Sequence, residues 1–211
     1  MSEMQAIALN FTPVDDAEEI TRAELYGLLA RLWLAPPDAP LIEHLRRAST
    51  DAAAQDSPLT APWRALVAAM SATTAAAAVD EYAALFEGVG KPEVLPYGSY
   101  HVTGALNERP LVRLRDELRE LGLARDPARA ETEDHVAFLF EVMRYLIAGG
   151  DAAVCNLERQ RRFFRAHLQP WIERMCDTVE AHPRARLWRA VAAFTRVFMQ
   201  VESQGFDMLE A

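Results

Sequence analysis

The feature that most constrains the fold of this 211-residue chain is a helical period that runs through most of it. From about residue 13 to residue 202, apolar side chains recur every three or four positions, in runs separated by proline and glycine. That spacing puts apolar residues on one face of an α-helix, whereas a half-buried strand alternates apolar and polar residues. No window alternates convincingly with a period of two, and no Asn-Gly or Asp-Gly hairpin turn occurs. The pattern predicts an all-α protein.

Proline and glycine divide this pattern into separate helices. The first is expected to begin after Thr12 as the N-cap and to end before Pro36-Pro37, and a short second helix covers residues 39–48. An alanine-rich helix that begins near Pro62 is expected to reach Leu85-Phe86, because alanine is the best helix former.

Further start and stop signals predict the helices of the second half of the chain. They are Pro110 and Gly122 for one helix, Thr132 and Gly149 for the next, Asp151 as a cap, Pro170 as a first-turn residue, and Pro183 before the last helix. Residues 203–211 are expected to form a loose tail. With no internal repeat in evidence, we expect one globular domain over residues 1–211, built from about nine or ten helices.

Composition and charge exclude several functional classes. Acidic residues outnumber basic ones by 31 to 22, a net charge of −9, which disfavours a nucleic-acid binder because such proteins need a basic surface. None of the five histidines has a glutamate three positions before it, so the Glu-x-x-His pairs of a di-iron bundle are missing. The chain has no P-loop, GxSxG or HExxH motif either. We therefore expect no catalytic residues, no cofactor and no enzymatic activity.

The cysteines and the hydropathy pattern bear on metals and location. Cys155 and Cys176 form no CxxC motif, so we expect structural thiols without a metal. No stretch approaches 18 uninterrupted apolar residues, and the N-terminal segment has no basic start followed by an apolar run. These observations predict a cytoplasmic protein with no membrane insertion.

The segment 88–104 differs from the rest because it carries four glycines and two prolines, so no helix is expected through it. A long irregular segment in a compact domain is usually functional. Directly before it, Tyr82, Leu85 and Phe86 share one helix face, and they are either core residues or the floor of a groove that accepts an apolar peptide.

The motif Glu131-Thr132-Glu133-Asp134-His135 also has two interpretations. In the first, Thr132 caps the following helix and the acidic residues complement its dipole. In the second, Asp134 and His135 lie at the mouth of a groove and contact a partner, and His135 titrates near neutral pH.

Four segments between Glu81 and Trp171 stand out by their order and spacing: EYAALFEGVG, LPYGSYH, ETEDHVAFLFEVMRYL and QRRFFRAHLQPW. Together they resemble the TorD/DmsD family of cytoplasmic redox-enzyme maturation chaperones. The resemblance implies an all-α fold and a partner, the twin-arginine signal peptide on the apo form of a molybdenum-cofactor oxidoreductase. The chaperone would hold this peptide so that the cofactor is loaded before export.

Carried over by position, the resemblance implies a peptide-binding site. Its residues are Tyr82, Leu85, Phe86, Pro96, Tyr97, Glu133, Asp134 and His135. Two departures bear on the client: Glu133 stands where the family usually has proline, and Gly98 stands where it has glutamate. The resemblance names neither the client nor a bound guanine nucleotide, and it allows a monomer or a domain-swapped dimer.

Two other functions stay open at this point. One is an all-α enzyme or small-ligand protein with a pocket between the 88–104 loop and the helix of His135. The other, a helix-turn-helix regulator, is disfavoured by the net charge. A basic stretch in the helix of Cys155 is more typical of a solvated face, or of a contact with the mature domain of the client, than of a DNA-reading helix; it comprises Arg159, Arg161, Arg162 and Arg165.

Overall fold

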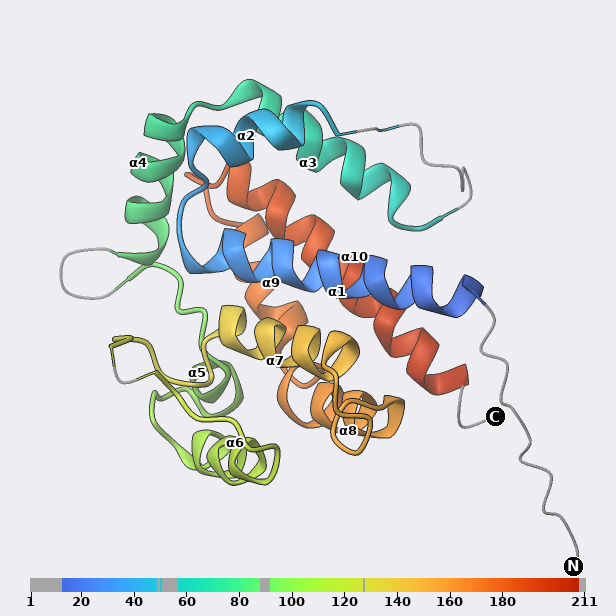
Figure 1. Ribbon diagram of the computed structural model, residues 1–211. Helices are drawn as coiled ribbons and strands as arrows, with labels where there is room; N and C mark the ends of the chain where they lie inside the picture. Colours follow the sequence, from blue (N-terminus) through green and yellow to red (C-terminus); the bar gives the residue numbers. More distant parts are fainter. Residues whose placement is uncertain (1–12, 49, 51–56, 88–91, 127, 209–211) are drawn as a thin grey trace, which may run out of the picture.

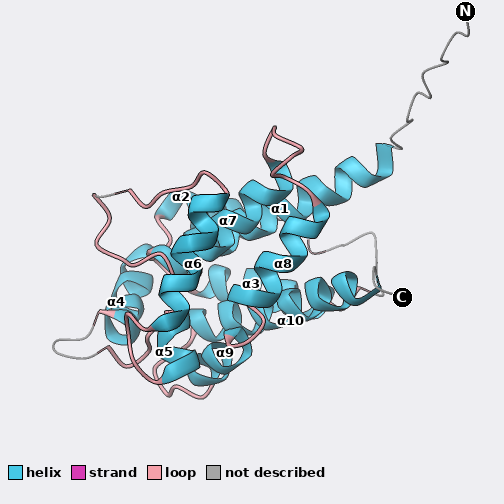
Figure 2. Cartoon of the chain, turned by 90° about the horizontal axis from the view of Figure 1, so that it is seen from below, coloured by secondary structure: helices cyan, strands magenta, loops and turns pink. Residues whose placement is uncertain are grey.

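The computed structural model describes residues 13–208 apart from 49, 51–56, 88–91 and 127. Its regular structure is ten helices, with no β-strand in this part of the chain, which confirms the all-α prediction (Figures 1 and 2). The helices are α1 (Pro13–Leu34), α2 (Ala39–Arg46), α3 (Thr60–Ala72), α4 (Ala75–Phe86), α5 (Gly98–Thr103), α6 (Arg109–Glu120), α7 (Val136–Ala148), α8 (Leu157–His167), α9 (Ile172–Glu180) and α10 (Leu187–Met208).

The two longest helices, α1 and α10, organise the packing. Helix α1 packs mainly on α7, and α10 packs on α3 and α9 (Figure 1). The Tyr26 ring on α1 lies 5.8 Å from Phe140 on α7 and 4.9 Å from Phe198 on α10, measured between ring centroids. These rings belong to one continuous cluster of buried apolar residues drawn from nine of the ten helices and from the loops.

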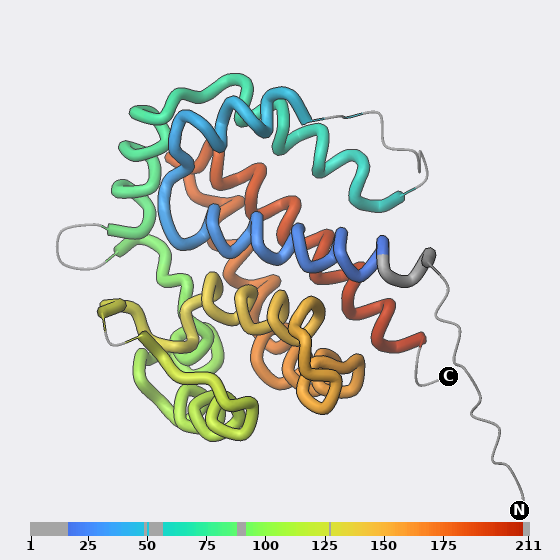
Figure 3. Tube along the Cα trace, viewed as in Figure 1, coloured from blue at the N-terminus to red at the C-terminus, as the bar shows by residue number. Residues whose placement is uncertain are grey.

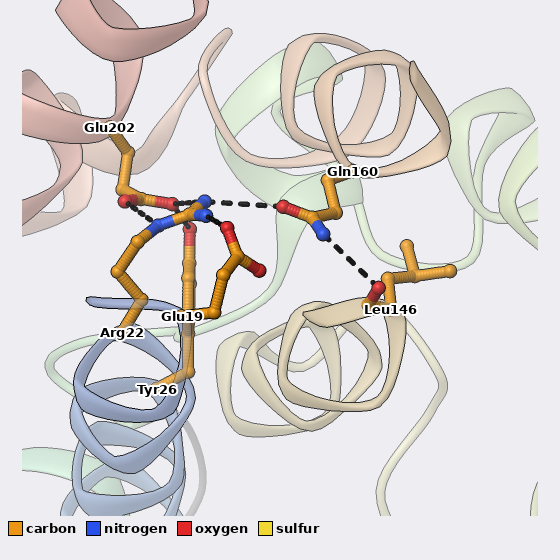
Figure 4. A network of polar contacts seen from close by, with 6 residues as sticks. All are labelled: Glu19, Arg22, Tyr26, Leu146, Gln160 and Glu202. Carbon is orange, nitrogen blue, oxygen red and sulfur yellow. Dashed lines mark hydrogen bonds and ion pairs between the residues drawn. The ribbon is translucent and has the colours of Figure 1, made fainter. Parts of the chain in front are cut away.

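A polar network joins α1 to α10 inside this packing (Figure 4). The Arg22 guanidinium donates to both carboxylate oxygens of Glu202 at 2.8 Å and to Glu19 at 2.6 Å. The Tyr26 hydroxyl donates to Glu202 at 3.0 Å, and Gln160 on α8 accepts a longer bond from Arg22. We call Arg22, Tyr26, Gln160 and Glu202 the clasp. It holds the start of α1 beside the end of α10, and both lie on the same side of the molecule (Figure 3).

The alanine-rich segment forms two helices rather than the single predicted one. Thr73 is extended, with φ −110° and ψ 166°, and ends α3. The Thr74 hydroxyl then accepts a hydrogen bond from the Ala77 amide at 3.2 Å and caps α4. Two adjacent threonines therefore override the helix propensity of the alanines. The first is β-branched and ends α3, and the second caps α4.

Three other boundaries differ from the predictions. A short helix, α5, lies inside the segment expected to have none. Asn156, not Asp151, caps α8, since its side chain accepts from the Arg159 amide at 3.1 Å. Residues 203–208 continue α10 rather than forming a tail, and they are held there because Phe206 is buried against Phe164 at 5.3 Å. The predicted N-cap Thr12 lies outside the described residues.

The predicted end of α6 is confirmed. Gly122 has a positive φ of 70°, its amide donates to Arg119, and the Leu123 amide donates to Leu118 at 2.8 Å. This pair of bonds is the Schellman motif, in which glycine is favoured because its backbone enters the left-handed region without steric cost.

Candidate functional site

The structure joins the two sequence motifs, because residues 96–99 bond directly to the start of α7. Tyr97 and His135 form an antiparallel bridge. The Gly98 amide donates to the Asp134 carbonyl at 2.9 Å, and the Val136 amide donates to the Pro96 carbonyl at 2.9 Å. Four of the eight predicted site residues, Pro96, Tyr97, Asp134 and His135, are therefore neighbours.

Asp134 lies beneath the surface, where it is 3% exposed. One carboxylate oxygen accepts from the Ser99 amide at 2.8 Å and the other accepts from the Thr132 hydroxyl at 2.6 Å. Both oxygens thus tie the start of α5 to the start of α7. In this structure Asp134 holds the loop, and its pairing with a peptide arginine stays a prediction that requires these bonds to open.

His135, not Thr132, is the N-cap of α7. Its Nδ1 accepts from the Ala137 amide at 3.2 Å, while the Thr132 hydroxyl is used by Asp134. The imidazole lies 5.1 Å from the Tyr97 ring, and burial lowers the pKa of His135 to about 4, against the attraction of Asp134. The expectation that His135 titrates near neutral pH is therefore wrong for this conformation, because burial disfavours the charged ring.

The three helix-face residues of α4 are buried. The Phe86 ring lies 5.9 Å from both Trp33 and Trp188, and Leu85 is fully covered. The Tyr82 hydroxyl donates to the Leu34 carbonyl at 2.8 Å. These contacts place the three side chains in the core, so their role in holding a peptide stays a prediction.

The accessible part of the motif region carries carboxylates. Glu131 accepts from the Tyr97 hydroxyl at 3.1 Å, and Glu133 forms a two-pronged ion pair with Arg115 at 3.0 and 2.9 Å. Burial, followed by the charges of Glu87 and Glu131, raises the pKa of Tyr82, so both carboxylates act near its ring. Neither Glu87 nor Glu131 pairs with an arginine or lysine side chain in the described ranges. Within the described part of the chain, their negative charge is therefore not balanced by a basic side chain.

Gly98 is explained by close packing. A Cβ added there would lie 3.0 Å from Nε1 of Trp171, a side chain that is itself buried. A glutamate, as the family resemblance would place at this position, therefore does not fit against this tryptophan without a shift.

Two apolar grooves flank α7. The larger, about 730 Å³, lies between α1 and α7, and we call it the α1/α7 groove. The other, about 390 Å³, lies between α6, the 123–133 connector and α7, and it shares Arg129, Phe138 and Glu141 with the first. Of the eight predicted site residues, only Glu133 lines either groove.

The α1/α7 groove was not predicted. Ile20 belongs to the three- and four-residue apolar spacing of the first helix, which predicts an inward side chain, yet it is 57% exposed and lines the groove. The available signal was a second face of α1, where the small residues Ala23, Gly27 and Ala30 recur at helical spacing.

A pocket between the loop and the helix of His135 was the basis of the small-ligand alternative. The cavity found there, lined by Ser99 and Asp134 among others, has a volume of about 30 Å³. That is about the volume of one water molecule. In this conformation it does not admit a metabolite.

The remaining features concern metal-binding groups, the two cysteines and the hydropathy of the helices. The described residues include no group of three or more His, Cys, Asp or Glu side chains placed to hold a metal ion. Cys155 is half-buried and donates to the Tyr145 carbonyl, whereas Cys176 is buried, which raises the pKa of its thiol. Among the helices in the described ranges, none is long and apolar enough to cross a membrane.

Comparison with known proteins identifies the family. The family model described as the nitrate reductase delta subunit matches residues 52–177, which is more than half of the chain and includes all eight predicted site residues. This chain belongs to that family. The TorD/DmsD resemblance is thereby confirmed.

Relatives support this assignment. The chaperone protein TorD of two Vibrio cholerae serotype O1 strains is 24% identical to the chain over 136 residues. The matched segment is 61% of this chain and 62% of each relative, so the chain spans less than two thirds of their length. Helix α1 lies outside the residues that the family model matches.

Proposed function

We propose that this protein is a cytoplasmic maturation chaperone that binds the twin-arginine signal peptide of a molybdenum-cofactor oxidoreductase. It holds the apo enzyme until the cofactor is loaded and then releases it for export. The observation that carries the proposal is the family match over residues 52–177, which covers both the loop and the acidic motif. The geometry of these two motifs supports it.

The arginine pair is assigned to Glu131, beside Tyr97, and to Glu87, the C-cap of α4 near Tyr82. Glu87 and Glu131 are not neutralised by other side chains in the part of the chain that the structure describes, and Glu133 is shared with the half-exposed Arg115. Carboxylates bind guanidinium groups through charge-assisted and often two-pronged hydrogen bonds. The net charge of −9 also favours encounter with a basic peptide end.

The proposal is tested by calorimetric titration of the chain with a synthetic twin-arginine signal peptide at low and high salt. Glu131→Gln is expected to weaken binding about fivefold at low salt and less at high salt, because exposed charge pairs are worth up to ~1 kcal/mol and are screened. Glutamine still accepts the Tyr97 hydrogen bond, so the loop is expected to stay in place.

The matched control is Glu173→Gln on α9, an exposed glutamate that accepts from Gln200. It should leave the affinity unchanged at both salt concentrations. A parent protein that binds no signal peptide, or a Glu173 variant that weakens as much as the Glu131 variant, contradicts the proposal.

A further inference from the structure

The α1/α7 groove is long, apolar and open. Seven residues of α1 line it, all on one helix face, from Ile20 to Leu34. At 1.5 Å rise per residue this face is about 21 Å long. The opposite wall is α7, from Ala137 to Ala148. The volume of the α1/α7 groove, about 730 Å³, is within the range of ligand-binding clefts.

The two walls run antiparallel. Ala137 at the start of α7 and Leu34 at the end of α1 line the groove together. At the other end, Arg22 and Leu146 are linked through Gln160, which accepts from Arg22 and donates to the Leu146 carbonyl (Figure 4). The groove therefore has two distinct ends, a Leu34 end and an Ile20 end.

The floor consists of small side chains. Ala23, Gly27 and Ala30 recur along α1, and Ala137 faces them from α7. These small residues let α7 approach α1 closely, which buries the alanines and leaves an apolar groove above the contact, the kind of surface that helix-in-groove binders use. The apolar stretch of a signal peptide has 7–15 residues, which as a helix spans about 10–22 Å. That length matches the groove.

The Leu34 end of the groove adjoins the carboxylates. The Leu34 carbonyl accepts from Tyr82 on α4, the helix whose C-cap is Glu87, and Glu131 lies near the same ring. Burial, followed by the charges of Glu87 and Glu131, raises the pKa of Tyr82. Arg31, which lines this end, is neutralised by Asp38 through two contacts of 3.0 Å. Among the described residues, Glu87 and Glu131 thus lie next to this end without an arginine or lysine partner, opposed by the one lining cation that has no ion pair, Arg129, and a peptide with arginines before its apolar stretch is complementary to the two carboxylates.

We propose that the α1/α7 groove binds the apolar stretch of the signal peptide as a helix that runs antiparallel to α1. The arginines lie at the Leu34 end, near Glu87 and Glu131, and the apolar helix extends toward Ile20. This inference rests on the proposed function, and it assigns half of the binding site to a helix that the family match does not include.

The test fills the groove without removing a core contact. Gly27→Leu places a side chain on the floor, where the added Cβ meets only the flexible Arg144 side chain, at 3.0 Å. The matched control is Gly205→Leu in α10, where a Cβ meets nothing within 4 Å. Leucine favours helix over glycine, so neither thermal midpoint should fall. Calorimetric titration with the signal peptide is expected to show at least tenfold weaker binding for Gly27→Leu and unchanged binding for Gly205→Leu.

A second variant keeps the test decisive if Gly27→Leu folds poorly. Ile20→Asp changes an exposed residue at the far end of the groove and is expected to weaken binding severalfold at every salt concentration. Unchanged affinity in Ile20→Asp and in a folded Gly27→Leu protein overturns the groove assignment. If Glu131→Gln still weakens binding in that case, the proposed function stands although the groove assignment is wrong. Failure of the parent chain to bind the peptide overturns both.

Two charge variants test the direction of the peptide. Arg129 is exposed, lines the groove near Phe138 and has no ion-pair partner in the described ranges. Arg129→Gln is expected to strengthen binding about two- to fivefold at low salt, because it removes a charge that repels the arginines. Glu24→Gln, nearer the Ile20 end, should have no effect. Weaker binding in Glu24→Gln together with no change in Arg129→Gln overturns the proposed direction.

Discussion

Asp134 and His135 show how residues predicted to bind a peptide can also build the fold. Asp134 uses both carboxylate oxygens on Ser99 and Thr132, and His135 uses Nδ1 to cap α7. A substitution at either position therefore alters the loop that carries Tyr97. Loss of peptide binding in such a variant does not by itself show a direct contact, so stability has to be measured beside affinity.

The burial of His135 gives the protein a predictable response to pH. Its pKa is about 4 in the folded chain because of burial, and about 6.5 in an unfolded one. Between these values the unfolded chain binds more protons, so the free energy of unfolding falls as the pH falls through this window. From about pH 7 to about pH 5 the contribution of His135 to the loss is ~2 kcal/mol. Urea titrations at the two pH values measure it.

The control for this prediction is His135→Asn, which keeps a capping acceptor and removes the titrating ring. The variant should lose less stability than the parent between the two pH values. An equal loss in both proteins would show that other groups cause it.

At the same scale, the sequence could not separate core from site. Tyr82, Leu85 and Phe86 lie at helical spacing, which is the same for a core face and for a groove floor. Only the position of Trp33 and Trp188, distant in sequence, decides that Phe86 is covered. The family resemblance predicts which residues form a site, but it does not say which of their side chains are accessible.

At the scale of elements, helix ends fixed by the backbone were predictable and caps were not. Pro36-Pro37, Gly122 and Gly149 mark ends that the structure confirms, because proline and glycine act through their own backbone. Thr132 and Asp151 were predicted as N-caps, but His135 caps α7 and Asn156 caps α8. The starts of α7 and α8 each have more than one candidate cap nearby, and tertiary contacts decide which of them caps the helix.

Gly122 provides a test of one such element. Its φ of 70° is costly for a residue with a Cβ, so Gly122→Ala is expected to lower the free energy of unfolding by ~1 kcal/mol. Gly150→Ala is the control, because its φ is not in the left-handed region and an added Cβ meets nothing within 4 Å. Equal stability of the two variants in urea titration would contradict the role of Gly122.

For the whole molecule, the clasp is the charged connection between the two longest helices, beside the neutral hydrogen bonds from Trp33 to Thr195 and from Trp188 to the Leu32 carbonyl. Arg22→Met is expected to lower the free energy of unfolding by ~3–5 kcal/mol, because it leaves the buried Glu202 without its cationic partner. The double variant Arg22→Met/Glu202→Met should be more stable than the single one, since no unpaired charge is buried. Both are measured by urea titration.

A surface pair serves as the control for the clasp. Arg119→Met removes the exposed ion pair with Asp116 and should change the stability by less than ~1 kcal/mol. A double clasp variant no more stable than Arg22→Met alone would show that the lost stability comes from packing rather than from charge.

The clasp also sets an order of events during synthesis. Arg22 emerges from the ribosome early, whereas its partner Glu202 lies 180 residues later in the chain. At a translation rate of about 5–20 residues per second, the first helix waits roughly ten seconds or more for the last. Until then the start of α1 carries an arginine whose buried partner does not yet exist. Both walls of the α1/α7 groove, the last of whose lining residues is Ala148, are therefore synthesised well before the contact that fixes the start of α1, and α1 is held in place only when nearly the whole chain has been made.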